Sequence, residues 1–237
     1  MRGVLVTGTG TEVGKTVVAA VIANTARSAG ARVAVFKPAV SGLVDYPLAP
    51  ETWESAPELP DHALLRLAAG SAQGDDEVAP YRYGPPVSPH LAAELAGAPI
   101  DPDLLRGAAL DATQDADLLV CEGVGGFLVP LTADYLVRDL ARDLALPVMV
   151  VGLPGLGTIN HTLLTIESVC AAGLEVASVV LNRWPAETSA TERSNLETIE
   201  RLGGVAVETL PELDLSAPGS WPALPLPGPP GRLRLAA

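Results

Sequence analysis

Short apolar runs alternate along most of this chain with longer stretches whose apolar residues recur at helical spacing. The apolar runs lie at residues 4–7, 32–37, 118–122, 147–151, 176–181 and 205–209. The helical patterns lie at about 14–29, 61–69, 91–97, 102–113, 135–145, 158–172 and 188–202. Continuous apolar runs are typical of parallel strands that are buried on both faces. The pattern predicts an α/β fold, with a mostly parallel sheet of about seven strands and helices on both faces.

Proline-rich segments interrupt this alternation. Residues 43–60 contain four prolines and predict a loop, and residues 71–90 are rich in turn-forming residues. Residues 214–237 contain six prolines and show neither a helical nor a strand period. We therefore expect one domain over residues 1–213, followed by an extended C-terminal tail over residues 214–237.

A glycine-rich segment joins the first predicted strand to the first predicted helix. It reads Gly8-Thr-Gly-Thr-Glu-Val-Gly-Lys15-Thr16. Backbone N–H groups of such a loop can surround a phosphate, and the helix behind it adds further donors. Lys15 would reach the terminal phosphates and the Thr16 hydroxyl would bind magnesium. The spacing from Gly8 is one residue longer than the strict phosphate-loop pattern, so a plain turn with a solvated lysine is the alternative.

Charge and cysteine usage exclude several classes of partner. The formal net charge is −13, which argues against nucleic acid and against an anionic membrane surface. Cys121 and Cys170 lack metal-type spacing and imply no disulfide framework. The chain begins directly in a strand, without a leader pattern, and has no apolar run of bilayer length. We expect a cytoplasmic protein without membrane or nucleic-acid partners.

Polar residues at strand ends are the candidates for chemistry, because ligands of parallel sheets bind there. Glu122 precedes a glycine run and is placed to bind magnesium, unless it is an ordinary strand-end carboxylate. Lys37 ends the second strand and would stabilise a developing anion. The residues alone favour a helix cap for Asp61, and they leave the roles of His90 and His161 open.

Several blocks of the sequence together resemble the dethiobiotin synthase family. They are residues 8–16, Lys37-Pro38 with Ser41-Gly42, Ser88-Pro89-His90, Glu122-Gly-Val-Gly-Gly126 and Leu156-Gly-Thr-Ile-Asn-His-Thr162. The resemblance runs from residue 1 to about residue 213, and the longer loop spacing is the family's own form. It implies an ATP-dependent cyclo-ligase of biotin biosynthesis, with a P-loop NTPase-like fold.

The resemblance also implies a reaction sequence. One amine of 7,8-diaminononanoate captures CO₂ as a carbamate, whose oxygen attacks the γ-phosphate of ATP. The second amine then attacks the carbonyl of the resulting carbamic-phosphoric anhydride, closes the ureido ring and expels phosphate. Magnesium is the implied metal and ATP the co-substrate.

The resemblance implies catalytic, metal-binding, nucleotide-binding and substrate-binding roles for residues near the strand ends. Lys37 and Lys15 would be catalytic, and magnesium would bind Thr16, Asp61 and Glu122. The nucleotide would contact Thr11, Glu12, Val13, Gly14, Lys15, Thr16, Val17, Asp61, Glu122, Gly123, Val124, Gly125, Asn182, Arg183, Leu210, Pro211 and Glu212, with Asn182 reading the adenine. The diamine would contact Ser41 and, from the second subunit of a homodimer, Gly157, Thr158 and Asn160.

Two other interpretations compete with this one. A relative of the cobyrinate-type amidotransferases would need a glutaminase domain, for which the chain is too short. A ParA/MinD-like P-loop switch ATPase would usually carry a second lysine early in the loop, where Thr11 and Glu12 stand here.

The segment Pro38-Ala-Val-Ser41 and the proline-rich tail depart from the pattern of the dethiobiotin synthase family.

Overall fold

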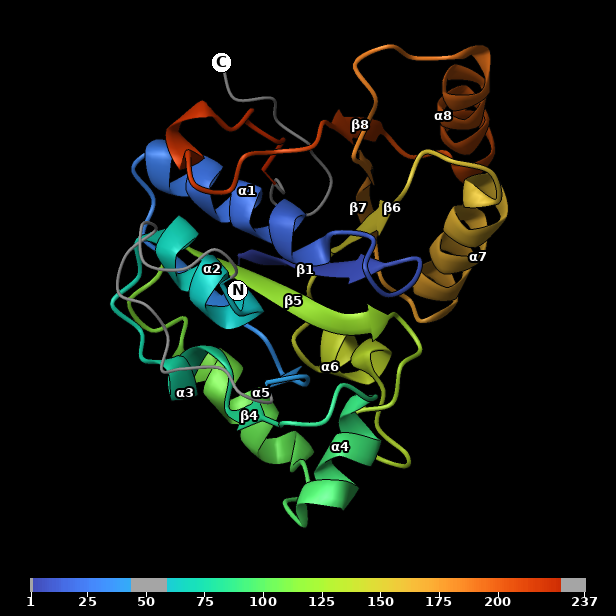
Figure 1. The fold of residues 1–237 in the computed structure, drawn as a ribbon. Helices are drawn as coiled ribbons and strands as arrows, with labels where there is room; N and C mark the ends of the chain where they lie inside the picture. The colour runs from blue at the N-terminus through green and yellow to red at the C-terminus, as the bar shows by residue number, and fades with distance from the viewer. Residues whose placement is uncertain (1, 44–58, 227–237) are drawn as a thin grey trace.

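The protein forms a parallel β-sheet between two layers of helices (Figure 1). A computed structural model describes residues 2–43 and 59–226, so most of the predicted loop at 43–60 and the end of the tail lie outside the described residues. The six strands of the main sheet are β1 (Gly3–Gly8), β2 (Val33–Phe36), β5 (Leu118–Gly126), β6 (Val148–Gly152), β7 (Val176–Asn182) and β8 (Val207–Leu210). Their order is β2-β5-β1-β6-β7-β8, and every pair is parallel.

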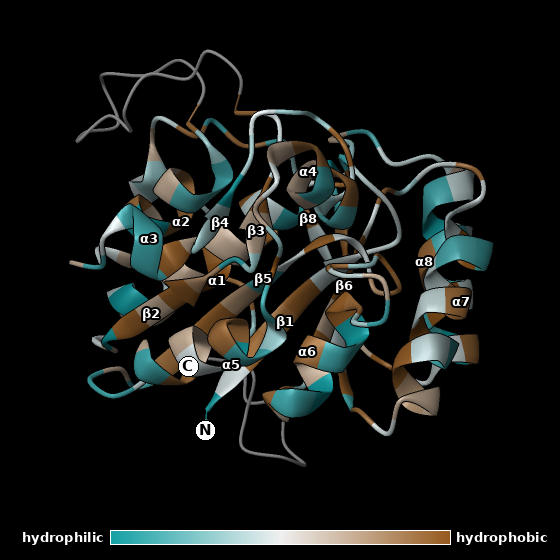
Figure 2. Ribbon diagram, turned by 90° about the horizontal axis from the view of Figure 1, so that it is seen from below, coloured by the Kyte–Doolittle hydropathy of each residue, from teal (hydrophilic) through white to brown (hydrophobic). Residues whose placement is uncertain are grey.

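Strands such as β1, β2 and β6 are buried on both faces, and successive residues point into different cores. In β1, Val4 and Val6 belong to one hydrophobic cluster, while Leu5 between them belongs to the other. The same alternation occurs in β5, where Val120 and Cys121 face opposite sides. Figure 2 shows the resulting band of hydrophobic residues along the central strands. Two-sided burial explains why these strands are continuous apolar runs in the sequence.

Helices divide between the two faces of the sheet. One face is covered by α1 (Lys15–Ser28), α2 (Asp61–Ala69) and the short α3 (Asp75–Val78). The other face is covered by α4 (Pro89–Ala96), α5 (Pro102–Asp111), α6 (Val137–Asp143), α7 (Thr158–Ala171) and α8 (Ala190–Gly203). The predicted α/β class with helices on both faces is therefore confirmed.

The expected strand count of about seven is slightly too high, because the main sheet has six strands in the described residues. A separate two-stranded sheet joins β3 (Ala39–Val40) to β4 (Tyr81–Arg82). β4 and α3 lie in the segment 71–90, which the sequence pattern assigned to turns, and β3 lies where no strand was predicted. Elements of two to four residues carry too little periodicity to be recognised, and pairing between distant segments forms them.

The described part of the predicted tail packs against α1. Trp221 and Leu224 are buried in the same cluster as the apolar face of that helix. A short 3₁₀ turn, η2 (Pro218–Ser220), precedes them, and the Asn24 amide donates to the Pro218 carbonyl at 3.1 Å. The division of the chain at residue 213 stays a prediction. Within residues 2–43 and 59–226, no helix is long and apolar enough to cross a membrane.

Candidate active site

The phosphate loop connects β1 to α1, and its glycines are required by its geometry. A Cβ on Gly8 would lie 2.7 Å from Cγ2 of Val13, so the loop folds back over this position only if it is glycine. Gly14, which precedes α1, has φ 89°, a conformation that other residues rarely adopt. Lys15 starts the helix, and its Nζ donates to the Gly10 carbonyl at 3.1 Å. The loop is therefore compact, with its lysine folded back across it.

Lys37 lies beside this loop in a buried ion-pair cluster. Its Nζ is 2.7 Å from Oε1 of Glu122 and 2.6 Å from Oδ2 of Asp61. The Thr16 hydroxyl donates to the same Glu122 oxygen at 2.8 Å. These four residues, which we call the Lys37 cluster, come from α1, the end of β2, α2 and β5. Neighbouring parallel strands end at one edge of the sheet, which brings together residues that are far apart in the sequence.

Burial and charge act in opposite directions on the groups of the Lys37 cluster. Burial favours neutral Lys37, but the attraction of Asp61 and Glu122 is stronger and raises the pKa of Lys37 above its ordinary value. Burial also opposes ionised Asp61, yet the pairing with Lys37 lowers the pKa of its carboxyl. For Glu122, burial dominates over Lys37 and raises the pKa. Lys37 therefore remains a cation at neutral pH.

Asp61 is positioned by the helix that it begins. It is the first residue of α2, the N-cap is Pro60, and no side chain caps this helix. The carboxylate points instead to Lys37, so the structure does not bear out the helix-cap interpretation. The backbone N–H of Lys37 donates to the carbonyl of Val78, the last residue of α3, at 2.8 Å. This bond holds the end of β2, while Asp61 holds the Lys37 side chain.

A cavity of about 400 Å³ opens over the phosphate loop and the Lys37 cluster. Thirteen predicted residues line it: Thr11, Glu12, Gly14, Lys15, Thr16, Val17, Lys37, Ser41, Asp61, Glu122, Val124, Gly125 and Arg183. Its apolar lining was not predicted from the sequence and comes from Ala39, Val40, Leu59, Leu64 and Leu215. The one available signal was that Ala39 and Val40 follow Lys37 closely, but apolar residues at a strand end are hard to tell from core residues.

Several predicted contact residues do not line this cavity. Gly123 packs towards α6, where a Cβ would lie 2.8 Å from Cγ1 of Val137. Leu210 is a fully buried core residue, and Asn182 is buried beneath the loop, where it donates to the Val13 carbonyl. Pro211 and Glu212 are exposed beyond β8. Gly157, Thr158 and Asn160 lie around the start of α7, outside the lining.

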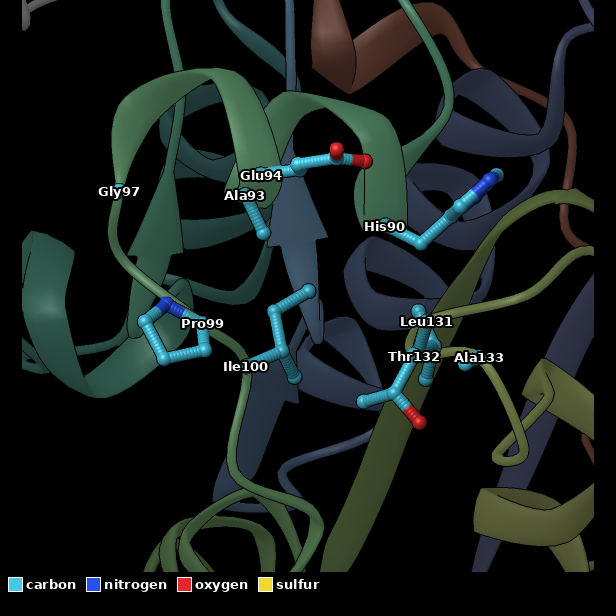
Figure 3. Close-up of a pocket in the computed structure, with 9 residues that line it drawn as sticks. All are labelled: His90, Ala93, Glu94, Gly97, Pro99, Ile100, Leu131, Thr132 and Ala133. Carbon is cyan, nitrogen blue, oxygen red and sulfur yellow. The ribbon is translucent and has the colours of Figure 1, made fainter.

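The two histidines of uncertain role line other hollows. His90 borders a cavity of about 380 Å³ between α4, the segment at 97–100 and the segment at 131–133 (Figure 3). Its floor includes the apolar residues Ile100 and Leu131, and it shares no residue with the cavity over the phosphate loop. His161 lies on α7 beside a third hollow, which Gly8 and Thr9 of the phosphate loop also line.

Comparison with solved structures shows that MinD cell division proteins share the P-loop NTPase-like fold of this chain. The MinC:MinD cell division complex of Aquifex aeolicus gives a TM-score of 0.55 at 15% identity, covering 92% of this chain and 86% of that one. The septum site-determining protein MinD complexed with Mg-ADP from Pyrococcus horikoshii gives 0.51 at 17% identity, covering 90% and 82%. Identities this low show similarity of fold alone.

Comparison of sequences is more specific. A family model described as an AAA domain matches residues 2–217. The ATP-dependent dethiobiotin synthetase BioD of Bacillus cereus strain G9842 is 40% identical, covering 87% of this chain and 81% of the relative. Those of Anaeromyxobacter dehalogenans strain 2CP-C and Rhodococcus erythropolis strain PR4 are 41% and 43% identical, each covering 85% of this chain and 86% and 84% of the relatives. This chain therefore belongs to the family of ATP-dependent dethiobiotin synthetases.

Proposed function

We propose that this member of the family forms the ureido ring of dethiobiotin with the Lys37 cluster as its catalytic centre. The family activity is that of an ATP-dependent ligase, which joins 7,8-diaminononanoate and CO₂ and converts ATP to ADP and phosphate. The observation that carries the proposal is the buried Lys37 ammonium, held within 2.7 Å of two carboxylates beside a phosphate loop. No other lysine except Lys15 occurs in the chain.

The phosphate loop would hold the triphosphate of ATP. Backbone N–H groups at residues 12–16 and the start of α1 supply donors and a favourable dipole. Lys15 is largely buried, and burial lowers its pKa although Glu122 opposes this. Its Nζ would exchange the Gly10 carbonyl for phosphate oxygens when the nucleotide binds. Arg183 and Leu215 line the same cavity and would border the nucleoside.

The Lys37 cluster also has the donors that magnesium requires. Thr16, Asp61 and Glu122 offer oxygen ligands, and the buried Oε2 of Glu122 has no hydrogen-bond partner among the described residues. A buried carboxylate oxygen without a partner is costly, so a cation there would satisfy it. Magnesium bound by these side chains would neutralise the charge of the transferring phosphoryl group.

Lys37 would act on the anions that form during the reaction. Its ammonium can pair with the carbamate oxygen before that oxygen attacks the γ-phosphate, and with the phosphoryl oxygens during transfer. The second amine then attacks the carbonyl and phosphate leaves, so negative charge stays close to Lys37 throughout. To reach these groups, Lys37 exchanges one of its present carboxylate partners. Ser41, at the cavity wall, would donate to the diamine.

A homodimer would complete the substrate site. Two exposed leucines, Leu128 and Leu164, line the hollow that the phosphate loop shares with α7 and are 53% and 57% exposed. A third, Leu156, lies just before α7 and is 99% exposed. A second copy docked on this face would bury them and bring its own α7 start close to the phosphate loop. The N–H groups around Gly157, Thr158 and Asn160 would then receive the carboxylate of the diamine.

The activity can be tested directly. With 7,8-diaminononanoate, bicarbonate, ATP and Mg²⁺, we expect dethiobiotin to form with one phosphate released per ring, measured by mass spectrometry and a phosphate assay. Omitting the diamine is the control and should abolish phosphate release. ATP hydrolysis that proceeds at the same rate without the diamine, and yields no ring product, would support a switch ATPase instead.

Lys37→Met should lower the turnover number by about a hundredfold or more, because the developing anions lose their nearest cation. ATP affinity, measured by calorimetry, should stay close to wild type, since Lys15 and the loop are intact. Removing the partner of buried Glu122 costs about 3–5 kcal/mol of stability, so the assay is run below the melting temperature of the variant. Lys37→Arg should recover stability but not the full rate. Near-native turnover in Lys37→Met would exclude Lys37 from catalysis.

Asp61→Asn should weaken metal binding by about tenfold or more, measured with Mn²⁺ by electron paramagnetic resonance in the presence of ADP. Asp75→Asn is the matched control, because Asp75 pairs with Arg66 on the neighbouring helix and does not line the cavity. If Asp61→Asn lowers only the melting temperature and binds Mn²⁺ like wild type, Asp61 is no metal ligand.

Leu164→Glu should convert the dimer into a monomer of 24.3 kDa, because a charge buried in the interface opposes docking. Activity should fall in proportion to the fraction of dimer that is lost. Leu202→Glu is the matched control, since Leu202 is 56% exposed against 57% for Leu164 but lies on α8. Sedimentation velocity measures the mass of both variants. A wild-type protein that is fully active as a monomer would refute the shared site.

A further inference from the structure

Asn182 connects β7, the fifth strand in the order of the main sheet, directly to the phosphate loop. It is the last residue of β7 and is 2% exposed. Its Nδ2 donates to the backbone carbonyl of Val13 at 3.0 Å, across 169 residues of sequence. A Cβ on Gly14 would lie only 1.9 Å from that nitrogen. The amide therefore fills the space directly under the loop, and only glycine at position 14 leaves room for it.

Both ends of this contact are conformationally unusual. Glu12 has φ 61° and Gly14 has φ 89°, so Val13 lies between two residues in the left-handed region. On the other side, Arg183 follows Asn182 with φ 57°. Non-glycine residues adopt such angles only where surrounding contacts hold them. The Asn182–Val13 hydrogen bond lies between these strained turns and fastens one to the other.

The two ends of the Asn182 amide have separate tasks. The atom that faces the Val13 carbonyl must be the nitrogen, because two acceptors would repel each other. Within the described part of the chain, the Oδ1 makes no hydrogen bond and is left to accept one from a ligand. Reading of adenine, the role suggested by the family, therefore uses only the oxygen, and the nitrogen is committed to the protein.

We propose that Asn182 is a positioning residue for the phosphate loop, whatever base the nucleotide carries. By holding the Val13 carbonyl, it fixes the turn from Glu12 to Gly14 so that the following N–H groups face the phosphates. This inference rests on the proposed phosphate-binding role of the loop. It adds that a residue expected to read the base also determines the affinity for a ligand that has no base.

Inorganic tripolyphosphate with Mg²⁺ separates the two tasks, because it carries the phosphates without the adenine. Asn182→Asp keeps an oxygen acceptor but replaces the donor with a second acceptor against the Val13 carbonyl. We expect tripolyphosphate and ATP to bind this variant about tenfold more weakly than wild type, as measured by calorimetry. Hydrogen exchange of the backbone amides at residues 8–16 should also become faster in the ligand-free protein.

Asn195→Asp is the matched control. Asn195 is 8% exposed, and its Nδ2 donates to the carbonyl of Pro154 at 2.9 Å, away from the phosphate loop. The control therefore loses the same kind of buried bond, but it should bind tripolyphosphate like wild type and keep slow exchange at residues 8–16. If Asn182→Asp does not fold, Asn182→Ser, which keeps a hydroxyl donor on a shorter side chain, takes its place.

The outcomes are distinct. An Asn182 variant that binds ATP weakly and tripolyphosphate like wild type would overturn the proposal and leave only base reading. The same conclusion follows if wild-type protein binds ATP but not tripolyphosphate, because the loop would then not act without the base. Wild-type protein that binds neither compound would refute the phosphate-binding role of the loop itself, which is a different failure.

Discussion

A lysine buried between two carboxylates is the constraint around which this site is built. An ammonium as enclosed as that of Lys37, whose side chain is 3% exposed, is tolerated only with partners of opposite charge. Asp61 and Glu122 provide them, which ties α2 and β5 to the end of β2. The same pairing keeps Lys37 protonated, because it outweighs the effect of burial on the pKa. The contact that holds these elements together thus also maintains the positive charge to which we assign the catalytic role.

The order of the strands in the sheet explains how single residues reach the phosphate loop from both of its flanks. In the order β2-β5-β1, the end of β2 brings Lys37 next to Glu122 in β5, and β5 pairs with the strand that leads into the phosphate loop. Lys37 therefore meets the loop from one side. Asn182 meets it from the other, because β7 lies two strands beyond β1. A loop held from both flanks needs little rearrangement before it binds phosphate, and such preorganisation favours transition-state stabilisation.

The sequence predicted what depends on local patterns and missed what depends on distant pairing. Two-sided burial makes the central strands apolar runs, so the strands of the main sheet and the phosphate loop were recognisable from residue order alone. The β3–β4 pair joins segments about forty residues apart, each too short to show a period. Asp61 looked like a helix cap because its partner Lys37 is distant in sequence. The bond from Asn182 to Val13 has no local signal either, since buried amides at strand ends are not distinguishable by spacing.

Lys15, Lys37 and Arg183 gather at one cavity of a chain that is strongly negative overall. ATP and a carbamate are anions, and a protein of net charge −13 repels them at long range. Both lysines of the chain nevertheless lie at one cavity, together with Arg183. Burial beside a low-dielectric wall strengthens their attraction at short range, where salt screens least. The neighbouring carboxylates Asp61 and Glu122 weaken that attraction, and the magnesium ion proposed to bind there would compensate their charge when the anions enter. Nucleotide and metal binding are therefore expected to be coupled through the same two carboxylates that now hold Lys37.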